Sequence, residues 1–183
     1  MNLVAAIEDL LSGPSRCGST HVIAIDGRAG AGKTTLASDL SLALGVNRTV
    51  LLLHMDEIYA GWENALGESL TRTLSKLMGN LAKASSSTLP IFNWSAMAFD
   101  SERVISPGDL IILEGVGSAQ EAVRTFATVT IWLDIDPIHG LERVLHRDGV
   151  GIQNQMRQWQ HDEDALFLRD CTREKADFIL STL

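Results

Sequence analysis

A glycine-rich segment of the chain carries residue types that suit the binding of a phosphate group. Gly27, Gly32, Lys33 and Thr34 occupy the fixed positions of the phosphate-binding pattern G-x-x-x-x-G-K-[ST]. Glycines allow positive φ angles, so successive backbone N–H groups can converge on phosphate oxygens, and the segment leads into a helix N-terminus that favours anions. The candidate nucleotide-binding residues are Gly27, Arg28, Ala29, Gly30, Ala31, Gly32, Lys33, Thr34 and Thr35.

The chemistry expected of this phosphate-binding loop (P-loop) is phosphoryl transfer from ATP in the presence of Mg²⁺. Lys33 can reach the β- and γ-phosphate oxygens and is a catalytic candidate, while the Thr34 hydroxyl can bind Mg²⁺. A complete pattern between an apolar strand and a helix argues against a chance glycine-rich turn.

Two acidic residues follow apolar runs that suit buried parallel strands. Asp56 comes just after the run 50–54, with Glu57 and Tyr59 beside it, and Glu114 ends the run 109–114. Ligand-binding residues of open parallel sheets lie beyond the carboxyl ends of the strands, so Asp56 is placed where chemistry is expected. A helix N-cap or a solvated carboxylate remains an alternative for Asp56.

Two arginines share one face of a helix that follows a further strand. Arg143 and Arg147 are spaced i and i+4, just before the glycine-rich break 148–151. In an acidic chain, arginines near a phosphate site indicate a role in stabilising the charge that develops on the phosphoryl group. The alternative is a surface helix on which these arginines pair with Glu142 or Asp148.

Apolar periodicity places these residues on alternating strands and helices. A short helix is expected before the first strand, further helices at 33–44, 63–84, after 137 and after the break, and a loop or short hairpin at 89–107. Alternation of this kind predicts an α/β fold with a parallel sheet between helix layers. The expected strands are 21–26, 50–54, 109–114, 129–133 and 176–180.

Length and charge limit the classes of function. The 183 residues suit one core, and a formal net charge of −8 argues against nucleic acid or an anionic membrane as the main partner. No signal peptide or membrane-spanning run is expected, and the predicted location is cytoplasmic.

The chain resembles the uridine kinase-like branch of the small-molecule P-loop kinases over most of its length. This resemblance implies a single domain over 1–183, a five-stranded sheet in the order 2-3-1-4-5 and a lid at about 143–160. The motifs that carry it are 26–35, 54–59 with Gly61 and Trp62, 114–117, 143–149 and 176–179.

The resemblance also implies roles for individual residues. Asp56 would contact the acceptor hydroxyl and take its proton, Glu114 would hold Mg²⁺ directly or through water, and Arg143 and Arg147 would lie in or beside the lid. Asn93 stands where relatives often carry Asp, so uridine is not implied as the acceptor. The candidate substrate-binding residues are Asp56, Tyr59, Trp62, Asn93, Trp94 and Arg103.

The aromatic residues of the segment 89–107 have two interpretations. Phe92, Trp94 and Phe99 are able to pack against a flat ligand or to form a small local core.

The predicted function is ATP-dependent phosphorylation of a hydroxyl on a small molecule, with a nucleoside as one candidate acceptor. A nucleoside monophosphate kinase is an alternative, but its acceptor phosphate calls for arginine clamps. Arg72, Lys76 and Lys83 fall on the outer face of a leucine-striped helix, which leaves Arg103 as a clamp candidate and favours an uncharged acceptor. A P-loop ATPase switch without an acceptor, the use of GTP as donor and assembly into a homo-oligomer stay open.

Overall fold

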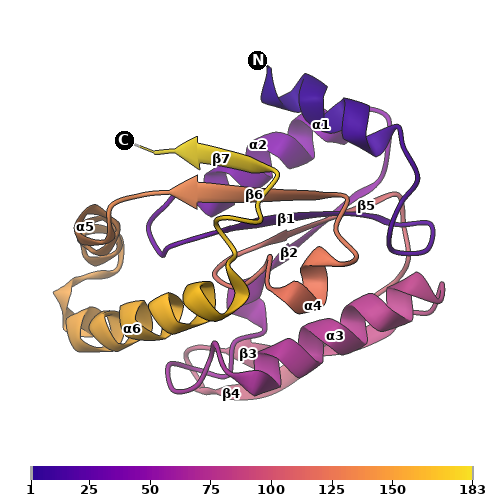
Figure 1. The fold of residues 1–183 in the computed structure, drawn as a ribbon. Helices are drawn as coiled ribbons and strands as arrows, with labels where there is room; N and C mark the ends of the chain where they lie inside the picture. Colours follow the sequence, from indigo (N-terminus) through magenta and orange to yellow (C-terminus); the bar gives the residue numbers. More distant parts are fainter. Residues whose placement is uncertain (1, 183) are drawn as a thin grey trace.

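A computed structural model describes residues 2–182, which form an α/β fold around a five-stranded parallel sheet (Figure 1). The strand order is β2-β5-β1-β6-β7, and every neighbouring pair is parallel. Counted along the chain, this is the order 2-3-1-4-5, so the predicted topology is confirmed. The strands are β1 (His21–Gly27), β2 (Val50–His54), β5 (Leu110–Glu114), β6 (Val129–Asp134) and β7 (Phe178–Ser181).

Helices cover both faces of the sheet (Figure 1). On one face lie α1 (Leu3–Leu11) and α2 (Lys33–Leu44), and on the other lie α3 (Glu68–Ala82), α4 (Glu121–Arg124) and α6 (Gln153–Asp170). The helix α5 (Pro137–Asp148) stands at the carboxyl ends of the strands, followed by the short turn η2 (Val150–Ile152).

Each face of the sheet has its own hydrophobic core. Leu40 and Leu44 of α2 pack against one face, and Leu74 and Leu77 of α3 against the other, all nearly inaccessible to solvent. Every residue of β5 is buried. Burial on both faces explains why the strands read as continuous apolar runs in the sequence.

The segment 89–107 folds largely as a hairpin, one of the two alternatives predicted for it. Its strands β3 (Ser87–Asn93) and β4 (Ala98–Ile105) pair antiparallel and lie beside α3 (Figure 1). The Asn93 side chain closes the turn, because Oδ1 accepts the N–H groups of Ser95 at 2.9 Å and Ala96 at 3.1 Å.

The main differences from the sequence-based expectation concern α3, α4 and β7. The helix expected at 63–84 begins only at Glu68, because Gly67 donates its N–H to the Asn64 carbonyl in a preceding turn. The four-residue helix α4 is too short to leave a periodic pattern, and β7 is shifted from 176–180 to Phe178–Ser181. Among residues 2–182, no helix is long and apolar enough to cross a membrane.

Candidate active site

The glycine-rich loop connects β1 to the N-terminus of α2, as the sequence pattern predicts. Gly30 has φ 80°, and a Cβ there would lie 2.3 Å from the Gly140 carbonyl oxygen of α5, so only glycine fits. The loop is therefore packed closely against the start of α5. Beyond it, Thr34 and Thr35 lie exposed in the first turn of α2, where backbone N–H groups are free to meet an anion.

The Lys33 ammonium contacts the backbone at the start of the glycine-rich loop. It is buried and donates hydrogen bonds to the carbonyl oxygens of Gly27 at 2.8 Å and Arg28 at 2.7 Å. Burial lowers the pKa of Lys33, and the surrounding carboxylates, Glu163 foremost, oppose this shift. A phosphate bound in the loop would offer the ammonium a charged partner in place of these carbonyls.

Thr34 and Glu114 bring two oxygen donors together where a Mg²⁺ ion is expected. The Thr34 hydroxyl donates to Oε1 of Glu114 at 3.1 Å, and the same oxygen lies 2.6 Å from Nδ1 of His54. Within residues 2–182, no group of three His, Cys, Asp or Glu side chains is arranged to hold a metal. One hydroxyl and one carboxylate nevertheless fit Mg²⁺, which usually binds few protein groups and completes its shell with water and phosphate oxygens.

Asp56 lies in the turn η1 (Met55–Glu57) that directly follows β2. The residue is partly open to solvent at the carboxyl end of the strand, on the same edge of the sheet as the loop after β1. Desolvation by the surrounding protein and the nearby Glu114 carboxylate raise the pKa of Asp56. The charges of Lys33 and Arg147 act in the opposite direction, so Asp56 lies within the electrostatic reach of the phosphate-binding groups.

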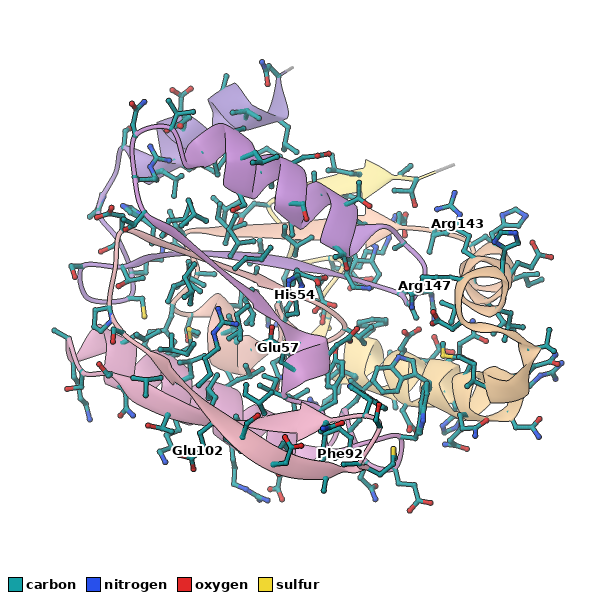
Figure 2. All side chains as sticks on the ribbon, turned by 180° about the vertical axis from the view of Figure 1, so that it is seen from behind. His54, Glu57, Phe92, Glu102, Arg143 and Arg147 are labelled. Atoms are coloured by element: carbon teal, nitrogen blue, oxygen red, sulfur yellow. The ribbon has the colours of Figure 1, made fainter. Side chains whose placement is uncertain are left out.

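The two arginines of α5 lie near the loop (Figure 2). Arg143 donates to the Gly30 carbonyl oxygen at 3.4 Å. Arg147 is exposed and forms two hydrogen bonds of 2.7 Å with the carboxylate of Asp148. The structure thus contains the pairing with Asp148 that the surface-helix interpretation requires, and it also places Arg147 where its charge acts on Asp56 and Glu114.

Aromatic side chains from four segments form one connected group beside Asp56, here named the aromatic cluster. Neighbouring rings meet edge to face with centroids 5.0–5.9 Å apart, as in Trp62 against Trp94 at 5.2 Å. The Trp94 indole N–H donates to the Asp56 carbonyl oxygen at 2.9 Å, which ties the cluster to η1. Its members are Tyr59, Trp62, Phe92, Trp94, Phe99 and Trp159.

Three of the predicted substrate-binding side chains are engaged within the protein. Tyr59 is buried and donates its hydroxyl to the Val116 carbonyl at 2.7 Å, and Asn93 donates to Asp100 at 2.6 Å besides closing its turn. Arg103 forms a half-buried ion pair with Glu57 at 2.8 Å and also donates to the Leu52 carbonyl. Glu57 therefore neutralises the basic residue that the sequence offered as an acceptor clamp.

Two acidic residues near the P-loop, Asp26 and Glu163, are not among the site residues that the sequence predicts. Asp26 is buried and accepts hydrogen bonds from backbone N–H groups, including that of Gly27 at 2.7 Å. Glu163 of α6 is buried and accepts the Ala29 N–H at 2.8 Å. A signal for Glu163 does exist in the sequence, since it is an acid within the mostly apolar stripe of its helix.

Several solved structures with this fold are named as kinases of small molecules. A possible uridine kinase from Bacillus stearothermophilus has a TM-score of 0.66 and 24% identity, with 98% of this chain and 100% of that chain covered. A candidate fructose transport system kinase from Silicibacter sp. TM1040 has a TM-score of 0.70 and 18% identity, with coverages of 98% and 99%. D-glycerate 3-kinase from Cryptococcus neoformans has a TM-score of 0.54 and 12% identity, with coverages of 99% and 96%.

The fold is therefore that of the small-molecule P-loop kinases, as the sequence resemblance implied. A model of the family described as AAA domain matches residues 23–165, which hold the glycine-rich loop, Asp56, Glu114 and both arginines of α5. The chain belongs to this AAA domain family. A comparison with curated proteins finds no match.

Proposed function

We propose that the protein transfers the γ-phosphoryl group of ATP to a hydroxyl group of a small, uncharged molecule, with nucleosides among the acceptors. The observation that carries this proposal is the position of Asp56. Asp56 follows the end of β2, and its carboxylate lies close enough to Lys33 and Glu114 for the charges of both to influence its pKa. A carboxylate there can accept a hydrogen bond from a hydroxyl and align it for attack on a phosphate held by the loop.

The nucleotide site follows from the loop and its surroundings. Backbone N–H groups of the loop and the Lys33 ammonium would bind the phosphates, and Thr34 and Glu114 would hold Mg²⁺. The metal ion supplies charge neutralisation on the phosphate oxygens when it is bound. Arg143, which already contacts the loop at Gly30, and Arg147 would add positive charge from the α5 side, in a lid at about 143–160.

An uncharged acceptor is favoured by the pairing of Arg103. A nucleoside monophosphate kinase must hold a second phosphate, which calls for arginines free to form bidentate contacts. Arg103 instead pairs with Glu57, and Arg72 of α3 pairs on the surface with Glu68. The aromatic cluster offers ring surface, on which a flat acceptor such as a nucleoside base can pack.

A thermal-shift screen tests the proposal. The protein is mixed with ADP and Mg²⁺ and then with nucleosides, vitamins and sugars, because a ligand that binds the folded state raises the melting temperature. Acceptors that raise it further are assayed for ADP release from ATP. The proposal predicts ADP release that depends on one class of hydroxyl compound. Release that is independent of every added compound would favour a P-loop ATPase switch instead.

A further inference from the structure

The buried carboxylate of Glu163 joins two parts of the molecule that the proposed reaction must bring together. Its Oε1 atom accepts the backbone N–H of Ala29, in the P-loop, at 2.8 Å. The same oxygen accepts the indole N–H of Trp159, one turn earlier on α6, at 2.9 Å. Because both donors converge on one oxygen, a movement of the loop at Ala29 changes the hydrogen bond that holds Trp159.

The second oxygen of Glu163 is held near a positive charge without a hydrogen bond. Among the described residues, Oε2 of Glu163 and Nη1 of Arg28 are both buried without hydrogen-bond partners, and they lie 3.6 Å apart. A fully buried carboxylate with one unsatisfied oxygen is costly, so its presence at the loop calls for a specific reason. Arg28 is also tied to α6 through Asp164 and lies over the Phe167 ring.

Trp159 carries this connection onward to the acceptor side. Its ring meets Tyr59 at 5.0 Å and Trp62 at 5.9 Å between centroids, both edge to face. Trp62 in turn packs on Trp94, whose indole N–H donates to the Asp56 carbonyl oxygen. A continuous series of contacts therefore runs from the P-loop through Glu163 to the aromatic cluster and Asp56.

We propose that Glu163 is a positioning residue that couples the nucleotide loop to the aromatic cluster, so that nucleotide binding arranges the acceptor side through Trp159. This inference rests on the proposed function, because it assigns the loop to a nucleotide and the cluster to the acceptor. The coupling is carried by contacts between rigid side chains: packed rings and a shared hydrogen-bond acceptor transmit a displacement that solvated side chains would absorb.

Fluorine NMR of the full chain labelled with fluorotryptophan tests the proposal. Its four tryptophans give separate signals that Trp→Phe variants assign. Mg²⁺ and ADP are the probe, and their affinity is measured in parallel by calorimetry. In the parent protein we expect bound ADP to shift the Trp62 signal as well as that of Trp159.

Two substitutions break the series of contacts at different places. Glu163→Ala leaves the Ala29 N–H without its acceptor, so we expect an ADP affinity about tenfold lower and loss of the Trp62 shift. Trp159→Phe removes the indole N–H and leaves the contact between Glu163 and Ala29 intact. We expect near-parent ADP affinity and, again, loss of the Trp62 shift.

Two further variants separate coupling from a merely structural role. Glu163→Gln keeps an oxygen that accepts both hydrogen bonds, so the Trp62 shift should be retained. Asp162→Asn alters a neighbouring carboxylate of α6 that pairs with Gln158, and it should leave affinity and shift unchanged.

The outcomes distinguish this inference from the proposed function. A parent protein that does not bind ADP would overturn both. ADP binding with no Trp62 shift in the parent, or a full Trp62 shift in Trp159→Phe, would overturn the coupling alone. Trp159→Phe keeps this test decisive even where Glu163→Ala does not fold.

Discussion

Asp26 accepts a hydrogen bond from the backbone N–H of Gly117 at 2.9 Å, which fastens the end of β1 to the loop that follows β5. Its other oxygen accepts the N–H of Ala119 at 2.9 Å. Burial raises the pKa of Asp26 from 3.8 to about 6, against the opposing effect of these backbone donors and of Lys33. The residue before the P-loop thus holds the end of β1, which leads into the loop and Lys33, to the end of β5, which carries Glu114.

This raised pKa predicts a pH dependence of stability. The folded protein binds the Asp26 proton more tightly than the unfolded chain, so the stabilising contribution is complete below about pH 4 and is lost as the pH rises through about 6. The free energies of unfolding of the parent and of Asp26→Asn, measured with denaturant, should therefore diverge as the pH rises. The parent should lose about 3 kcal/mol of this free energy relative to the variant over that range.

Asp109→Asn provides the contrasting control for Asp26. Hydrogen bonds from the Thr49 backbone and hydroxyl lower the pKa of Asp109, so its contribution is present at neutral pH and is lost as the pH falls through that lowered pKa. The two variants should change the pH dependence of the free energy of unfolding in opposite directions. A profile for Asp26→Asn that runs parallel to the parent would contradict the pKa shift.

The sequence was informative where function depends on local pattern and uninformative where it depends on distant contacts. The P-loop follows from its motif, and Asp56 after β2 and Glu114 at the end of β5 follow from the positions of the strand ends. The pairing of Arg103 with Glu57 joins residues 46 positions apart, and that of Glu163 with Ala29 joins residues 134 apart. Periodicity places each of these residues on its own element but does not indicate which element lies opposite.

Tyr59 illustrates the same limit from the acceptor side. Its place near Asp56 suggested substrate binding, but the ring is buried and the hydroxyl is bonded to the Val116 carbonyl. The i and i+4 pairing of Arg143 and Arg147 was readable from the sequence, whereas their contacts with Gly30 and Asp148 were not.

Removal of the Lys33 ammonium should abolish phosphoryl transfer. We expect Lys33→Ala to remain folded, to bind ATP more weakly and to show no turnover, because its ammonium is the cation of the P-loop pattern. Lys76→Ala, on the exposed face of α3, is the matched control and should behave as the parent. Circular dichroism checks that both variants are folded, and a turnover assay measures their use of ATP. Full turnover in folded Lys33→Ala would refute the catalytic role of Lys33.

We expect the Arg147 guanidinium to release the Asp148 carboxylate and to bind a phosphate oxygen of the nucleotide. There it should stabilise the negative charge of the transition state. Loss of one charge-assisted hydrogen bond predicts a kcat about 10- to 100-fold lower in Arg147→Ala, with a smaller change in the KM for ATP. Arg72→Ala removes an exposed arginine that pairs with Glu68 and serves as the control. Unchanged kinetics in the double alanine variant at Arg143 and Arg147 would leave both as surface residues.

Asp56 should serve the acceptor and not the nucleotide. Asp56→Asn keeps the size of the side chain and removes its charge and basicity, so Mg²⁺–ATP affinity should remain near that of the parent. The transfer rate should fall by roughly 10²–10⁴, the usual contribution of a positioned base. Glu114→Gln gives the opposite expectation, since Glu114 contacts Thr34 and would hold the metal ion.

Calorimetric titrations with ATP, each with and without Mg²⁺, separate the two acids. If Asp56 accepts the proton of the acceptor hydroxyl, its Asn variant retains the gain in affinity that Mg²⁺ confers, and Glu114→Gln loses it. A metal-binding role for Asp56 would reverse this pattern, because removing a charged ligand weakens the ion and the nucleotide bound with it. A large loss of Mg²⁺-dependent affinity in Asp56→Asn would therefore rule out the acceptor-base assignment.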